Sequence, residues 1–177
     1  MLAVRSLIRK ETRGQEEPLN IITFSFDYDY ESMLAQTGHN LYYWTSGYDF
    51  SWGVPDEQTP KNFIKMLPDK IPNYVDFDLI LCPNRGVYNI CSGLSGHLHI
   101  PIICLEHEAP TDEYKTYNQQ NWNNISAIDG DINVFSSQQC RDGWEKMGYI
   151  AELSSENFIE VWRNVFLQAA DIVYTRN

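Results

Sequence analysis

Long hydrophobic runs and basic side chains are both scarce in this chain of 177 residues. No apolar stretch approaches the roughly 20 residues that a membrane-spanning helix requires, and the first 18 residues lack the apolar centre of a secretory signal. Lys and Arg number 13 against 24 Asp and Glu, so the formal net charge is −11. Clustered basic side chains supply most of the affinity of nucleic-acid binders, so no nucleic-acid partner is expected. We expect a soluble, cytoplasmic protein with no membrane span.

Phosphate-binding glycine motifs are absent as well. The sequence has no G-x-G-x-x-G after its first strand-like segment, no G-x-x-x-x-G-K and no G-x-S-x-G. These absences argue against dinucleotide oxidoreductases, P-loop NTPases and α/β-hydrolases, and we expect no bound cofactor.

The cysteines also lack a recognisable pairing or metal-binding pattern. None forms a C-x-x-C, and neither His97 nor His99 belongs to an H-E-x-x-H. We therefore expect small, buried, reduced thiols, with disulfides as the alternative, and no metal site. The four cysteines are Cys82, Cys91, Cys104 and Cys140.

Apolar runs rich in β-branched and aromatic residues predict a buried sheet. These runs lack polar alternation, which is typical of strands covered on both faces, and helix-length segments separate several of them. The pattern predicts an α/β protein with a Rossmann-like, doubly wound, mostly parallel sheet and helices on both faces. The expected strands are 19–26, 40–44, 77–83, the run "IPIICLEHEAP" at 100–110, and 131–137.

One domain, residues 19–153, is expected to follow an N-terminal arm (1–18) and to precede a C-terminal helix (154–177) that packs back on it. The basic cluster Arg5, Arg9, Lys10 and Arg13 is expected to be solvated in the arm. Residues 45–73 are rich in Pro and Gly, which predicts a long loop, with a short element around Phe63 to Leu67.

Capping and periodicity predict four helical segments. Residues 27–40 predict a short helix and a turn at Gly38, and residues 86–99 a crossover helix weakened by three glycines. Ser136 and Gln139 have capping-box spacing for a helix through Met147 that Gly148 ends. Ser155 is expected to cap the last helix, whose apolar stripe is Phe158, Ile159, Trp162, Val165, Phe166 and Ala169.

Polar residues follow three of the expected strands, where an open parallel sheet binds its ligands. His107 lies between Glu106 and Glu108, and this trio is the candidate catalytic group. Nearby negative charge would favour the imidazolium of His107, which can act as a general base toward a hydroxyl. The alternative is a loop in which His107 bonds a backbone carbonyl.

Six further residues are candidate substrate contacts: Asp27, Tyr28, Tyr30, Glu31, Asn84 and Arg85. Tyr28 and Tyr30 can stack on a sugar-like ligand or pack against the long loop. The "DYD" aspartates suit helix capping better than a D-x-D metal site, because they follow the first strand directly.

The ordered set "PLNIITFSFDYDYESMLAQTGHNLYYW", "FDLILCPN", "HIPIICLEHEAP" and "GDINVFSSQQCRDGWEKMGY" resembles the N-terminal, acceptor-side lobe of GT-B glycosyltransferases of the retaining, glycogen-synthase-like superfamily. The resemblance covers about Leu19 to Ile150. It implies that His107 is the acceptor-side histidine and that Tyr28 to Glu31 border the cleft. Where the family often has glycine in this first loop, the chain has "DYDYE", so donor diphosphate contacts there are not implied.

The resemblance also implies a second lobe for a nucleotide-sugar donor, which the residues after Tyr149 cannot form. The expected function is therefore that of a glycosyltransferase-like acceptor-side lobe in hexosyl transfer. It would bind a glycan acceptor and be inactive without a donor-lobe protein. The alternative is a non-catalytic interaction or structural module of a larger assembly. A small-molecule enzyme of another class is a third interpretation.

Overall fold

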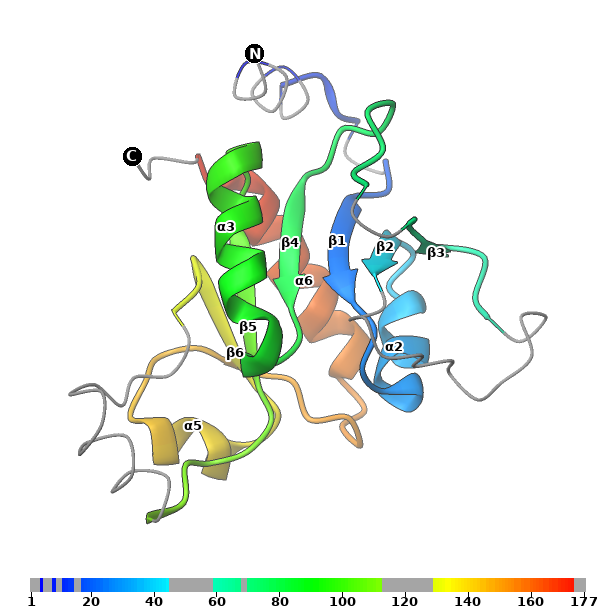
Figure 1. The fold of residues 1–177 in the computed structure, drawn as a ribbon. Coiled ribbons are helices and arrows are strands. Elements are labelled where there is room, and N and C mark those ends of the chain that lie inside the picture. Colours follow the sequence, from blue (N-terminus) through cyan, green and yellow to red (C-terminus); the bar gives the residue numbers. More distant parts are fainter. Residues whose placement is uncertain are drawn as a thin grey trace.

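The computed structural model describes residues 4, 8, 11–14, 17–44, 59–67, 70–112 and 129–173. Within these ranges seven strands form one all-parallel sheet in the order β3-β2-β1-β4-β5-β6-β7 (Figure 1). The predicted Rossmann-like fold is confirmed. The strands are β1 (Asn20–Phe24), β2 (Asn40–Trp44), β3 (Phe63–Lys65), β4 (Leu79–Cys82), β5 (Ile102–Glu106), β6 (Ile132–Phe135) and β7 (Tyr149–Ile150).

Helices cover both faces of this sheet. Helices α2 (Tyr28–Ala35) and α6 (Phe158–Asp171) lie on one face, and α3 (Tyr88–Leu98) lies on the other (Figure 1). The short helix α5 (Gln138–Trp144) lies beyond the carboxyl ends of the strands, and a 3₁₀ turn, η2 (Arg85–Val87), leads into α3.

Two apolar layers explain why the strands lack polar alternation. On the α6 side, Phe158, Trp162 and Phe166 are at most 1% exposed and pack with side chains of β1, β4 and β5. On the α3 side, Cys91 packs with the opposite-facing side chains of the same strands, such as Ile80. Each large apolar side chain buried in this way stabilises the fold by about 1.5–3 kcal/mol.

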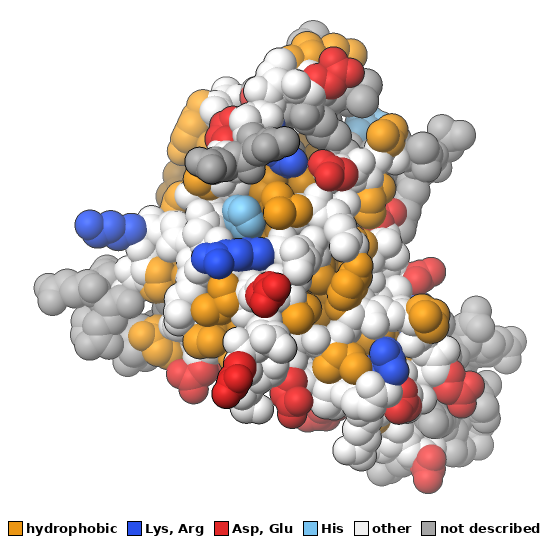
Figure 2. All heavy atoms as spheres, turned by 180° about the vertical axis from the view of Figure 1, so that it is seen from behind, with side chains coloured by type: hydrophobic (Ala, Val, Ile, Leu, Met, Phe, Trp, Pro, Cys, Tyr) orange, Lys and Arg blue, Asp and Glu red, His pale blue; other side chains and the backbone are white. Residues whose placement is uncertain are grey.

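The outer surface of the α6 side shows no single large apolar patch among the described residues. Hydrophobic side chains lie in small groups there, with acidic side chains spread between them and along the rim (Figure 2). Among the described residues, no helix is both long and apolar enough to cross a membrane. The four cysteines are free thiols buried inside the domain, as the sequence predicts.

The predicted helix caps were partly wrong. Helix α5 is capped by Ser137, whose hydroxyl accepts from the Cys140 amide, and not by Ser136. It ends at Trp144, where Glu145 adopts φ 54°, before Gly148 is reached. Serine is a good cap at either position, so the sequence pattern did not decide between neighbours.

The start of α6 is also later than predicted. Asn157 occupies the cap position without a side-chain hydrogen bond, while the Ser155 hydroxyl accepts from the Asn157 amide. The stripe itself is confirmed, because Phe158, Trp162 and four further apolar residues of α6 are buried. The short strand β7 was not predicted.

Arg13 corrects the expectation of a solvated basic cluster. Its side chain is 10% exposed, and its Nη1 and Nη2 lie 3.5 and 3.6 Å from carboxylate oxygens of Asp78 and Asp171. These pairs join the N-terminal segment to the amino edge of the sheet and to the end of α6. Arg5, Arg9 and Lys10 lie outside the described residues, as does most of the predicted long loop; its expected short element is β3.

Candidate functional site

The order of the strands places a crevice next to β1. The chain moves outward from β1 to β2 and β3, and in the opposite direction from β4 to β5, β6 and β7. Open α/β sheets bind ligands at this topological switch point, beyond the carboxyl ends of the strands. The segments that leave β1, β4 and β5 here are Ser25–Asp27, Pro83–Arg85 and His107–Ala109.

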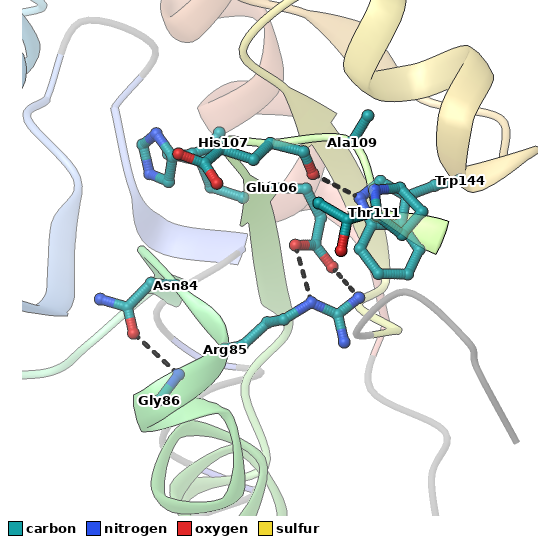
Figure 3. A pocket seen from close by; sticks show the side chains of 11 residues that line it. Asn84, Arg85, Gly86, Glu106, His107, Ala109, Thr111 and Trp144 are labelled. Atoms are coloured by element: carbon teal, nitrogen blue, oxygen red, sulfur yellow. Dashed lines mark hydrogen bonds and ion pairs between the residues drawn. The ribbon is translucent and has the colours of Figure 1, made fainter. Parts of the chain in front are cut away.

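A bidentate ion pair connects the segment after β4 with the end of β5. Arg85 Nη2 and Nε donate to the two carboxylate oxygens of Glu106 at 2.7 and 3.1 Å (Figure 3). The guanidinium also lies 3.9 Å from the ring centroid of Trp144, whose indole N–H donates to the Glu108 carbonyl at 2.8 Å. Glu106 is 5% exposed. Charge pairing and packing therefore both hold Arg85 in place.

A cavity of about 380 Å³, here called cavity A, opens beside this cluster. Its size is within the ~300–1,000 Å³ that is usual for small-molecule pockets. Asn84 lines it and caps η2, because its Oδ1 accepts from the Gly86 amide at 2.9 Å (Figure 3). The lining residues are Asn84, Arg85, Gly86, Leu105, Glu106, His107, Glu108, Ala109, Pro110, Thr111 and Trp144.

His107 is half-buried above the switch point. Its Nε2 lies 2.9 Å from the Pro83 carbonyl oxygen, which can only accept, so Nε2 carries a proton and Nδ1 holds the lone pair of the neutral ring. The ring packs on Phe26 and Tyr30 at centroid distances of 4.7 and 5.4 Å. The His107 carbonyl accepts from the Ser136 hydroxyl at 2.5 Å. The ring of His107 is thus bound to the segment after β4, and its backbone to the segment after β6.

The protonation state of His107 corrects the prediction. Burial lowers its pKa, and this effect outweighs the opposing effects of the Pro83 carbonyl and the charges of Asp27 and Glu108. The nearby negative charges do favour the imidazolium, but desolvation is the larger effect and shifts the pKa of His107 toward the neutral ring. The alternative in which His107 bonds a backbone carbonyl is confirmed as geometry. A neutral ring with a lone pair remains suited to accept a proton.

The residues after β1 mainly hold the local fold. Asp27 caps α2 as predicted, its Oδ1 accepting from the Tyr30 amide at 2.8 Å. Glu31 is 2% exposed, and burial raises its pKa to about 7. The Tyr30 hydroxyl accepts from the indole N–H of Trp162 at 3.2 Å, and burial raises the Tyr30 pKa. Tyr28 is half-buried. A role of these four residues in binding substrate stays a prediction.

A second cavity, here called cavity B, has a volume of about 410 Å³ and lies on the other side of His107. Five of its lining residues were not among the predicted site residues: Phe26, Ser136, Glu152, Leu153 and Ser154. They follow three different strands and form no local motif in the sequence. Trp144, in cavity A, was missed too, although it is the tryptophan of the quoted "W...GY" segment. Cavity B is lined by Phe26, Asp27, Tyr30, His107, Ser136, Glu152, Leu153 and Ser154.

Comparisons with known proteins found no matching family model, no matching curated protein and no matching solved structure. In the part of the chain that the structure describes, no group of three or more His, Cys, Asp or Glu side chains is placed to hold a metal ion. The chemistry of the site is therefore argued from its own residues, which offer a neutral imidazole, carboxylates, hydroxyls and aromatic rings.

Proposed function

We propose that this chain is a glycosyltransferase-like acceptor-side lobe that binds a glycan at the carboxyl edge of its sheet. The observation that carries the proposal is His107, a neutral imidazole at a strand end that lines both cavity A and cavity B. Because Nε2 is engaged with the Pro83 carbonyl, Nδ1 is the atom that can accept a hydrogen bond or a proton from a sugar hydroxyl.

The surroundings of His107 support a hydroxylated ligand. Ser136 and Ser154 offer hydroxyls in cavity B, and Asn84 and Thr111 offer polar side chains in cavity A. Phe26 and Tyr30 supply aromatic surface against the imidazole. A small number of polar groups on a largely apolar lining is the usual composition of a small-molecule site.

Donor activation requires a partner in this proposal. Arg85 is the sole Lys or Arg among the described residues that line the two cavities, and its guanidinium is bound to Glu106 and stacked on Trp144. Glycosyl transfer requires positive charge or hydrogen-bond donors at the leaving diphosphate, and such electrostatic stabilisation is usually the largest catalytic effect. A donor-lobe protein, or a larger assembly, would supply these groups.

A non-catalytic interaction module is the second candidate function. It is favoured by apolar side chains close in sequence to the cavity walls. Met147 is 90% exposed, and Tyr149 and Leu153 are 36% and 38% exposed. Exposed apolar side chains near one edge are typical of protein contacts when they form a continuous patch.

Ligand binding is the experiment that tests the proposal. The purified chain is screened by thermal shift against mono- and oligosaccharides and nucleotide-sugars, since a ligand of the folded state raises the melting temperature. We expect glycans to bind wild type and His97→Ala, which changes an exposed histidine of α3, and to bind His107→Ala at least tenfold more weakly. His107→Gln, which keeps a side-chain N–H for Pro83, is the second variant.

Catalysis is measured on the same samples. We expect no nucleotide-sugar hydrolysis or transfer by the chain alone. Turnover that His107→Ala abolishes would contradict the requirement for a donor lobe. An absence of binding across glycans and nucleotide-sugars would contradict the proposed function and favour the interaction module.

A further inference from the structure

Cavity B differs from cavity A in the charged side chains that line it. Asp27 and Glu152 line it and are both exposed, and none of the described residues that line it is Lys or Arg. Carboxylates carry negative charge at neutral pH, so the described wall of cavity B has two negative charges and no Lys or Arg to balance them. In cavity A, by contrast, the described lining includes Arg85, which neutralises Glu106 through two hydrogen bonds, and one further carboxylate, Glu108.

Three of the residues that line cavity B have aromatic rings. Phe26 and His107 pack at 4.7 Å between ring centroids, Tyr30 packs against both, and all three rings line the cavity. The faces of aromatic rings attract cations through their quadrupole, and carboxylates attract them through their charge. Two different side-chain chemistries therefore select for positive charge in this cavity.

The remaining polar groups of cavity B do not oppose a cation. Ser136 donates its hydroxyl hydrogen to the His107 carbonyl, so its oxygen lone pairs are the atoms it can present to a ligand. His107 is held neutral because burial lowers its pKa, and it adds no positive charge beside the carboxylates. Ser154 is exposed and can accept or donate.

We propose that cavity B binds the positively charged amine of an amino sugar, with Asp27 and Glu152 as its counter-charges and the Phe26 ring beneath it. This inference rests on the proposed function, and it specifies the acceptor as an amine-bearing glycan. The hydroxyls of the same sugar lie toward His107, which borders both cavities.

Matched sugars test the role of the charge. Glucosamine, N-acetylglucosamine and glucose are titrated into the ¹⁵N-labelled chain and followed by NMR at low and high salt. Two partly exposed ion pairs and one cation–π contact give an expected preference for glucosamine of about five- to tenfold over the two neutral sugars. Salt is expected to reduce this preference, because it screens exposed charges.

Two variants test whether the preference for glucosamine depends on the carboxylates of cavity B. The double variant Asp27→Asn, Glu152→Gln is expected to bind glucosamine no better than glucose, and asparagine keeps the cap of α2. Glu156→Gln, which removes an exposed charge from the neighbouring segment outside cavity B, is the control and is expected to keep the preference. Loss of the preference in the control alone, or its persistence in the double variant, would overturn the assignment to cavity B.

The outcomes separate this inference from the proposed function. Equal binding of all three sugars would overturn the amine site and leave the glycan-binding function standing. Binding of spermidine with no binding of any sugar would support a cation site and overturn the glycan function. No binding of any of these ligands would overturn both.

Discussion

Substitution of Glu31 tests how burial changes the pKa of a carboxylate at the carboxyl edge of the sheet. Its Oε1 accepts from the Phe26 and Asp27 amides at 2.6 and 3.4 Å, and its Oε2 accepts from the Ser25 hydroxyl at 3.2 Å. Glutamine can reproduce this pattern, since an amide oxygen accepts from the backbone and an amide nitrogen donates to the serine. Glu31→Gln therefore removes the titration and keeps the contacts.

The expected effect follows from the raised pKa. Burial raises the pKa of Glu31 from its ordinary 4.5 to about 7, against the lowering effect of its hydrogen bonds. A raised pKa in the folded state contributes stability that is complete below pH 4.5 and is lost as the pH rises through 7. At 1.36 kcal/mol per pKa unit the whole contribution is about 3 kcal/mol, of which about 2.5 kcal/mol falls between pH 5 and 8.5.

Urea denaturation at pH 5.0 to 8.5 measures this contribution. We expect the free energy of unfolding of Glu31→Gln, minus that of wild type, to increase by about 2.5 kcal/mol across this range. Taking the difference cancels the titration of other groups. Glu160→Gln, at an exposed position of α6, is the control and is expected to give a flat difference. A flat difference for Glu31→Gln as well would refute the reasoning.

Three further predictions concern residues around the sheet. Trp162→Phe removes the indole N–H bonded to the buried Tyr30 hydroxyl, and should cost about 2 kcal/mol in a urea titration. Arg85→Ala removes both hydrogen bonds to the buried carboxylate of Glu106 and should also cost about 2 kcal/mol, less than a fully buried pair because Arg85 is 30% exposed. Burial lowers the His39 pKa from 6.5 to about 4. Wild type should therefore lose about 1–2 kcal/mol of stability as the pH falls from 6.5 to 4, after allowing for the partial exposure of His39. The variant His39→Gln should lose less stability over the same pH range.

Each of these has a result that would contradict it. A Trp162→Phe variant as stable as wild type would show that the bond to Tyr30 carries no net stability. For Arg85, equal loss in Arg85→Lys and Arg85→Ala would mean that the bidentate geometry is critical, while no loss in either would contradict the ion pair's role. For His39, the same dependence on pH in His39→Gln as in wild type would assign the acid instability to other groups.

The sheet could be predicted from the sequence because its signal is local and repeated. Runs such as 79–83 and 100–105 are apolar at every position, and such runs form strands covered on both faces. The terminal helix was predicted from the same kind of signal, since Trp162 and Phe166 repeat at helical spacing. Strand β7 has two residues, which is too short to produce a pattern.

Contacts between distant segments could not be predicted in this way. Ser136 and Ser137 are equally good caps locally, and the choice between them follows from the bond that Ser136 makes to the His107 carbonyl, 29 residues away in the sequence. Arg13 looked like part of a solvated cluster because its partners, Asp78 and Asp171, are far along the chain.

Contacts between distant segments also determine the chemistry of the candidate site, and the sequence did not predict them. The motif Glu106-His107-Glu108 suggested a charged imidazole, because the sequence shows the neighbouring carboxylates but does not show how far the imidazole is buried. In the folded chain Glu106 forms an ion pair with Arg85. His107 packs on Phe26, and desolvation is the largest effect on the pKa of His107. The grouping of polar residues beyond the strand ends was predictable from topology alone.

Mapping amide shift changes by NMR while an amino sugar is titrated tests the central claim most directly. We expect saturable shifts at Asp27, His107, Ser136 and Glu152, at the carboxyl edge of the sheet, and their loss in His107→Ala. Saturable shifts confined to the amino edge, around Asn20 and Asp78, or no shifts at all, would contradict it.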